Sequence, residues 1–117
     1  MINQDRGICF YCAQCSRACM VYADFSTETC LIFPAQKNGG QIDLFVNAMV
    51  REVTTDKEGK ATGVSYINKE DRKEYKLKGK VVVLAASACS SARILLNSKS
   101  SQHPNGLGNS SDIVGKY

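Results

Sequence analysis

Apolar and polar residues alternate through the middle of the chain, which is the pattern of strands with one buried and one solvent-exposed face. The predicted strands are Ile42–Val46, Val50–Thr55, Ala61–Ile67 and Glu74–Leu77. The Gly-containing stretch Asp56–Lys60 and the polar stretch Asn68–Asp71 predict the turns that join the last three of these strands. Residues 50–77 are therefore expected to form an antiparallel meander of three strands.

The segment Val81–Ala86 has a different pattern, because it is continuously apolar. Such a run is typical of a parallel-type strand that is buried on both faces. Small residues follow at Ser87–Ser91, and the apolar positions of the helix predicted after the strand are Ala88, Ala92, Leu95 and Leu96. Small residues at this point either let a ligand approach the amides at the helix start or simply allow close packing of strand on helix. The fold class expected from these elements is α/β.

A short helix is predicted before the meander. Ser26 and Thr27 are typical N-cap residues, and Gly39–Gly40 is a typical helix stop. Pro34 is tolerated in a helix only near its start, so the helix is expected to be short or to begin near Pro34. Residues 1–25 have little periodicity and are expected to form a cysteine-rich loop.

Length and charge narrow the classes of protein. A chain of 117 residues forms one domain at most, and a domain of this size buries roughly two-thirds of its unfolded surface. The net charge of +4 is spread along the chain, and the dense patch Lys69–Lys80 alternates in sign, as the solvated face of a hairpin does. No nucleic-acid partner is therefore expected. No apolar stretch approaches the ~20 residues of a membrane span, and the compartment, cytoplasmic or periplasmic, is left open.

Four cysteines, Cys9, Cys12, Cys15 and Cys19, form a C-x2-C-x2-C-x3-C run. Ferredoxin-type iron–sulfur loops have the same order of gaps, although Met20 stands where that signature has proline. Zinc sites separate their cysteine pairs by a dozen or more residues, so the crowding favours an iron–sulfur cluster over zinc. The run therefore predicts a metal site with all four cysteines as ligands.

The two remaining cysteines, Cys30 and Cys89, lie in apolar segments and are expected to be small buried hydrophobes. The other four are too clustered to join distant loops, so a disulfide scaffold is not expected.

Four segments in order resemble the middle of a glucose–methanol–choline (GMC) oxidoreductase. They are Asn47–Val53, Gly59–Tyr66, Val82–Leu96 and Pro104–Gly115. The resemblance implies an incomplete FAD/NAD(P)-binding, Rossmann-like domain over residues 26–117. It also implies a longer protein, because no G-x-G-x-x-G occurs in the chain. The cysteine run resembles the sugar and sugar-acid dehydrogenase branch, some members of which carry a cluster, although Cys12 is shifted relative to their pattern.

The resemblance also implies particular sites. The main chain of Val50 is expected to hold the adenine of FAD, and the strand end Ala85, Ala86 and Ser87 to approach the ADP half of the cofactor. The family's catalytic histidine lies in a part of the enzyme not represented here, and His103 is interpreted as a surface residue. The implied reaction is oxidation of a CH–OH group in a sugar, polyol or sugar acid, with flavin taking the hydride and an electron-acceptor protein as a partner. The chain alone is expected to be inactive.

Two other interpretations remain open from the sequence. One is a small iron–sulfur electron-transfer module, in which the cysteine run is the function and the remainder is a scaffold. The other is a binding or structural domain with inert cysteines. The substrate, the electron acceptor and the oligomeric state are not fixed by the sequence.

Overall fold

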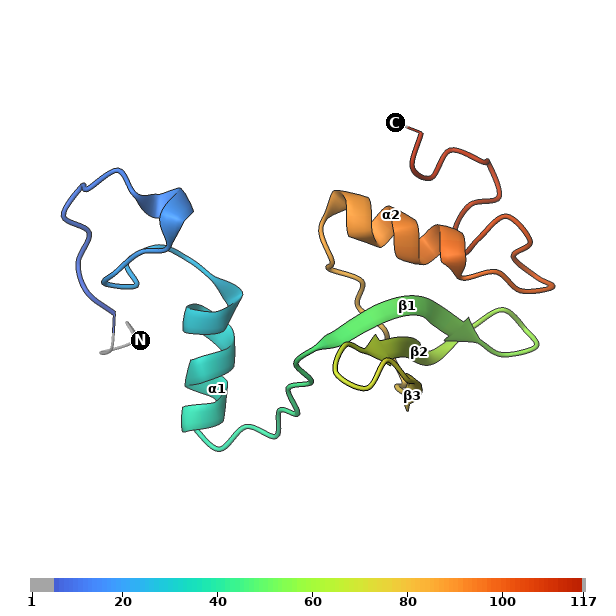
Figure 1. Cartoon of the computed structure of the whole chain (residues 1–117), viewed down its shortest axis with the longest axis horizontal. Coiled ribbons are helices and arrows are strands. Elements are labelled where there is room, and N and C mark those ends of the chain that lie inside the picture. Colours follow the sequence, from blue (N-terminus) through green and yellow to red (C-terminus); the bar gives the residue numbers. More distant parts are fainter. Residues whose placement is uncertain (1–5, 117) are drawn as a thin grey trace. The chain divides into compact units, whose positions relative to one another are not determined.

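A computed structural model describes residues 6–116 of the chain (Figure 1). These residues belong to two compact units, Met1–Leu44 and Phe45–Tyr117. Among them, no helix is both long enough and apolar enough to cross a bilayer.

The first unit contains a 3-10 turn, η1 (Cys15–Arg17), and a helix in two parts, η2 (Glu28–Ile32) and α1 (Phe33–Lys37). Ser26 begins this helix, because its hydroxyl accepts the Thr29 N–H at 3.1 Å and its carbonyl accepts the Cys30 N–H at 2.9 Å. The start predicted at Ser26 is therefore confirmed, and the alternative start near Pro34 is wrong.

Pro34 explains why the helix changes its geometry halfway. Proline has no N–H to donate, and its ring crowds the carbonyl four residues earlier, here that of Cys30. The turn before α1 is a wider, π-type turn, and Pro34 lies in the first turn of α1. The helix ends at Lys37, and Gly39 follows two residues later with a φ of +75°, a conformation that glycine adopts without strain.

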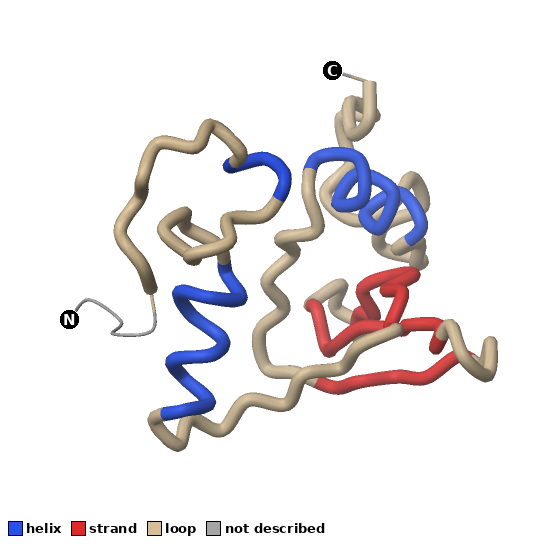
Figure 2. The backbone as a smooth tube through the Cα atoms, turned by 60° about the vertical axis from the view of Figure 1, so that its left-hand side comes forward, coloured by secondary structure: helices blue, strands red, loops and turns tan. Residues whose placement is uncertain are grey.

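The second unit contains the predicted meander. Strands β1 (Ala48–Thr55), β2 (Ala61–Asn68) and β3 (Glu74–Lys78) form one antiparallel sheet in the order β1-β2-β3 (Figure 2). Each of β1, β2 and β3 overlaps the strand predicted for it. All of β3 is exposed, which agrees with the interpretation of Lys69–Lys80 as a solvated hairpin.

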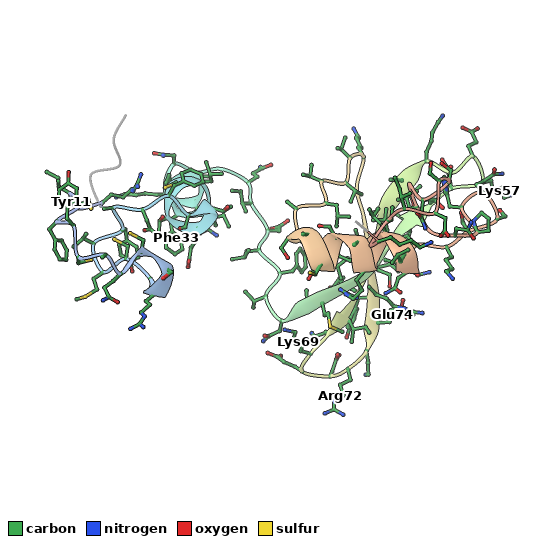
Figure 3. The ribbon with its side chains drawn as sticks, turned by 90° about the horizontal axis from the view of Figure 1, so that it is seen from above. Tyr11, Phe33, Lys57, Lys69, Arg72 and Glu74 are labelled. Carbon is green, nitrogen blue, oxygen red and sulfur yellow. The ribbon has the colours of Figure 1, made fainter. Side chains whose placement is uncertain are left out.

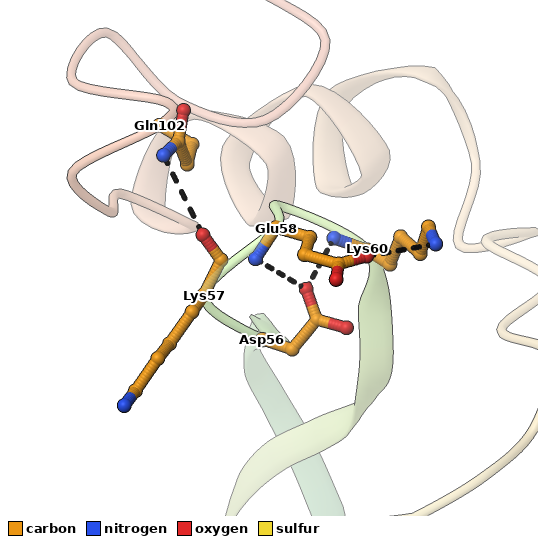
Figure 4. Close-up of polar contacts among 5 residues, drawn as sticks. All are labelled: Asp56, Lys57, Glu58, Lys60 and Gln102. Carbon is orange, nitrogen blue, oxygen red and sulfur yellow. Dashed lines mark hydrogen bonds and ion pairs between the residues drawn. The ribbon is translucent and has the colours of Figure 1, made fainter.

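The turn between β1 and β2 is held by hydrogen bonds among its own residues. The Asp56 carboxylate accepts the N–H groups of Glu58 and Lys60, both at 2.9 Å (Figure 4). This is the local bonding that favours aspartate at turns. The turn also contacts the loop after the last helix, because the Gln102 amide donates to the Lys57 carbonyl at 3.4 Å and His103 Nε2 lies 3.2 Å from the Gly59 carbonyl.

Helix α2 (Ala88–Asn97) lies along β1 (Figure 1). The small core of this unit lies between them, with Val53 on β1 and Ile94 on α2 both buried. Ser98, just after the helix, is buried with them. Helix α2 therefore packs against β1 and holds that strand in place through the shared core.

Two predicted strands are corrected by the structure. Ile42–Val46 and Val81–Ala86 form no strand, and Val81 and Val83 are 79% and 83% exposed. A strand exists only when a neighbour takes up its backbone hydrogen bonds, and the described residues supply no neighbour for either segment. They also supply no layers to cover both faces of Val81–Ala86, which is what a continuous apolar run requires.

Candidate functional site

The open edge of β1 is the first candidate site. The Lys69 N–H donates to the Asn47 carbonyl at 2.8 Å, which makes these two residues a hydrogen-bonded pair. Bonded and non-bonded pairs alternate along antiparallel strands, so the Val50 N–H and carbonyl point away from β2. Val50 thus presents a donor and an acceptor side by side at the edge of the sheet. The adenine contact expected at this residue stays a prediction.

A bulge follows this residue directly. The register shifts between Val50 and Glu52, so Arg51 has no partner on β2. A bulge bends its strand and redirects the neighbouring groups, and bulges are frequent beside active sites. The Arg51 side chain forms an ion pair with Glu74 at 3.1 Å, with both side chains about half exposed.

Side chains from α2 bond the groups that the bulge exposes. Arg93 Nη2 donates to the Val50 carbonyl at 2.9 Å, and Asn97 Nδ2 donates to the Arg51 carbonyl at 3.4 Å. Directly after the helix, Ser98 Oγ accepts the Val53 N–H at 2.8 Å.

The second predicted part of the site, Ala85, Ala86 and Ser87, lies immediately before α2. The Ala86 N–H donates to Ser91 Oγ at 3.2 Å, and Ser87 has a φ of +64° at the point where the helix begins. The helix contacts β1 in the same chain direction, from Arg93 at Val50 to Ser98 at Val53. Ser87 comes before Arg93 in the chain, so it lies toward the end of α2 that is nearer Val50 than Val53.

The cysteine loop in the first unit is the other candidate site. Its base is closed by the Gly7 N–H, which donates to the Val21 carbonyl at 2.7 Å. Arg6 adds three bonds from its guanidinium, to the carbonyls of Tyr22, Ala23 and Asp24 at 2.7–2.8 Å. All four cysteines of the run therefore lie within one closed loop.

All four thiols line a cavity of about 300 Å³, together with Phe10 and Tyr11. Cys9, Cys12 and Cys15 are exposed, and the four thiols are free. Hydrogen bonds from the backbone N–H groups of Asp24, Val21 and Ala23 lower the pKa of Cys19.

The cysteines nevertheless do not form a metal site as they stand. In residues 6–116, no three His, Cys, Asp or Glu side chains are placed to hold a metal ion. The two outlying cysteines also differ from expectation, since Cys30 is only half-buried and Cys89 is exposed. Cys89 is five residues before the buried Ile94, which places it on a different side of α2.

Sequence reasoning missed the polar residues that support β1. Arg93 and Asn97 are spaced i and i+4, which places them on one side of α2, and Ser98 follows directly after the helix. That spacing is visible in the sequence, but it does not say which strand they bond. Arg6 was missed in the same way, because its three acceptors are backbone carbonyls 16 to 18 residues away.

Comparison with known proteins places the chain in a family. A model of the GMC oxidoreductase family matches residues 1–116, so the chain belongs to this family. Its members are generally FAD-binding oxidoreductases, which agrees with the resemblance found in the sequence.

Two curated relatives are dehydrogenases. The chain is 43% identical over 75 residues to a 2-methyl-1,2-propanediol dehydrogenase from Mycolicibacterium austroafricanum, a match covering 64% of this chain. It is 32% identical over 82 residues to a fructose dehydrogenase large subunit from Gluconobacter japonicus, a match covering 70% of this chain. These matches span only 13% and 14% of the relatives' own length.

Proposed function

We propose that this chain is part of the FAD-binding domain of a dehydrogenase that oxidises a CH–OH group in a small polyol, sugar or sugar acid. The observation that carries the proposal is the family match over residues 1–116, since its members generally bind FAD. The two relatives named for a diol and for fructose favour a polyhydroxylated substrate. FAD, when bound, supplies the hydride acceptor that side chains lack.

The chain's own contribution is to hold the adenine half of the cofactor. Val50 presents an N–H donor and a carbonyl acceptor at one strand edge. Adenine has the complementary pair, an amino group beside a ring nitrogen. Ala85, Ala86 and Ser87 are small and lie at the same end of β1, so a ligand there would approach the main chain closely.

In the longer protein, Val81–Ala86 would become a strand of the parallel sheet. Its continuous apolar sequence suits burial on both faces, and the exposure of Val81 and Val83 leaves them free to pack. The neighbouring strands would come from sequence outside this chain.

Purification of a full-length protein that contains this chain tests the proposal. We expect flavin absorption at one FAD per chain, and bleaching of that absorption when the substrate is added without an acceptor. The substrate panel is 2-methyl-1,2-propanediol, fructose and a sugar acid, with an artificial dye as electron acceptor. A protein that neither holds flavin nor reduces the dye with any of these substrates would contradict the proposal.

A second candidate is an iron–sulfur cluster in the cysteine loop, passing electrons from flavin to an acceptor protein. The observation that favours it is that Cys9, Cys12, Cys15 and Cys19 all line one cavity. The thiols would have to move together on binding iron, since they do not converge now. Cys15 and Cys19 are the first choices as ligands.

Anaerobic reconstitution with iron and sulfide tests the cluster. We expect the full-length protein to take up iron and to show a paramagnetic signal, and Cys15→Ser to lose both. Cys89→Ser removes a thiol outside the loop and serves as the matched control. Equal iron uptake by wild type and Cys15→Ser would exclude the site.

A further inference from the structure

We propose that Arg93 is a positioning residue that holds the bulged edge of β1 in the shape that receives adenine, with Asn97 as its helper. The inference rests on the proposed function and extends it to residues that contact the main chain of the site rather than the cofactor. It is carried by the bonds that join α2 to the open edge of β1.

An unsupported edge of this kind does not keep one shape by itself. Within residues 6–116, β1 is an outer strand that only β2 pairs with, and the bulge at Arg51 interrupts even that pairing. A bulge weakens the local ladder and increases the twist of the strand. The orientation of the Val50 peptide therefore depends on what bonds it from the other side.

Helix α2 and the residue directly after it supply those bonds in place of a fourth strand. Arg93, Asn97 and Ser98 bond three successive outward-facing sites, namely the Val50 carbonyl, the Arg51 carbonyl and the Val53 N–H. Ser98 is further fixed by donating to the Ile94 carbonyl at 2.6 Å, within the buried core. The rigid end of this series is therefore at Val53, and Arg93 extends it to Val50.

The hydrogen bond from Arg93 leaves the N–H and the carbonyl of Val50 able to bind a ligand. A carbonyl oxygen has two lone pairs, so the Val50 carbonyl accepts from Arg93 and still has one to offer a ligand. The Val50 N–H points to the same edge. Arg93 thus sets the plane of this peptide and leaves the Val50 N–H and one lone pair of its carbonyl for adenine.

Ligand affinities distinguish a positioning role of Arg93 from a general role in stabilising the fold. If Arg93 acts at the adenine end, its loss weakens ligands that contain adenine and leaves the flavin end unaffected. If it only stabilises the fold, all ligands weaken together. We expect the first result, with a loss of about tenfold, as is typical of a hydrogen bond to a charged group.

The experiment uses the full-length protein with its flavin removed. Dissociation constants for FAD, ADP and FMN are measured for wild type, Arg93→Met and Arg93→Lys. Met keeps the aliphatic stem and removes the donors, whereas Lys keeps one charged donor. Lys69→Ala is the matched control, because Lys69 is an exposed cation on the β2–β3 turn of the same sheet (Figure 3).

We expect Arg93→Met to weaken FAD and ADP about tenfold and to leave FMN unchanged. Arg93→Lys should be intermediate, which keeps the test usable if the Met variant does not fold, and Lys69→Ala should match wild type. Arg93 variants that bind ADP as wild type does, or that lose FMN as strongly as ADP, would overturn the inference. Failure of wild type itself to bind FAD and ADP would instead overturn the proposed function.

Discussion

Ser98 shows how much one buried hydroxyl contributes at the scale of single residues. It is 3% exposed, accepts the Val53 N–H and donates to the Ile94 carbonyl. Ser98→Ala leaves the buried Val53 N–H without its acceptor, and we expect a loss of about 1–3 kcal/mol in the free energy of unfolding. Urea unfolding measures this, with the exposed Ser110→Ala as control. A loss no greater than that of the control would show that another group or water replaces the hydroxyl.

A second prediction at this scale concerns pH. The Ser65 hydroxyl, fully buried, donates to the Glu74 carboxylate and lowers the pKa of that group, and Arg51 lowers it further. A folded pKa below the unfolded one gives stability that is present above the unfolded pKa and is lost as pH falls through the folded pKa. The stability gap between wild type and Ser65→Ala should therefore shrink as pH falls from neutral to below the usual range of glutamate.

The measurement is urea unfolding at a series of pH values, together with NMR titration of the Glu74 carboxyl group. Tyr75→Phe is a control, since it removes a separate bond, 2.6 Å long, that lowers the pKa of Asp71. The titration of Glu74 should not change in that variant. A gap between wild type and Ser65→Ala that is constant with pH would contradict the assignment.

At the scale of elements, the pairing of β2 with β3 depends on a glycine. A Cβ on Gly63 would lie 2.0 Å from the Leu77 carbonyl oxygen, and backbone cannot yield as a side chain can. We expect Gly63→Ala to cost about 3 kcal/mol or more and to separate β3 from β2. Amide hydrogen exchange over β3 and urea unfolding measure the two effects.

Gly108→Ala is the matched control for this element. Gly108 has a φ of +68° and no atom near its Cβ position, so alanine there meets only backbone strain of about 1–2 kcal/mol. Exchange over β3 should remain slow in that variant. Slow exchange over β3 in Gly63→Ala would mean that the sheet absorbs the clash.

At the scale of the whole molecule, the chain alone should not retain FAD. In the proposed site, residues 6–116 offer FAD one strand edge, at Val50, and the small residues before α2, whereas tight sites cover most of a ligand's surface. We expect the purified 117-residue chain to lose added flavin on dialysis, as measured by visible absorption. Retention of FAD at a ratio near one would show that the chain holds a complete site.

The sequence by itself determined the features that depend on near neighbours. The turn at Asp56, the cap at Ser26 and the helix around Pro34 are each made by residues within about four positions, so their chemistry is readable from order alone. The three-strand meander follows for the same reason, since short turns join consecutive strands.

Only the tertiary structure decided what distant residues do to one another. The Arg93 guanidinium donates to the Val50 carbonyl across 43 positions, and nothing in the sequence around either residue indicates this contact. The apolar run Val81–Ala86 shows the reverse case, because its pattern is right for a buried strand but a strand needs partners. The pattern of apolar and polar residues indicates which kind of element a segment can form. Strand pairing, burial and the shape of the edge at Val50 depend on which distant segments come into contact.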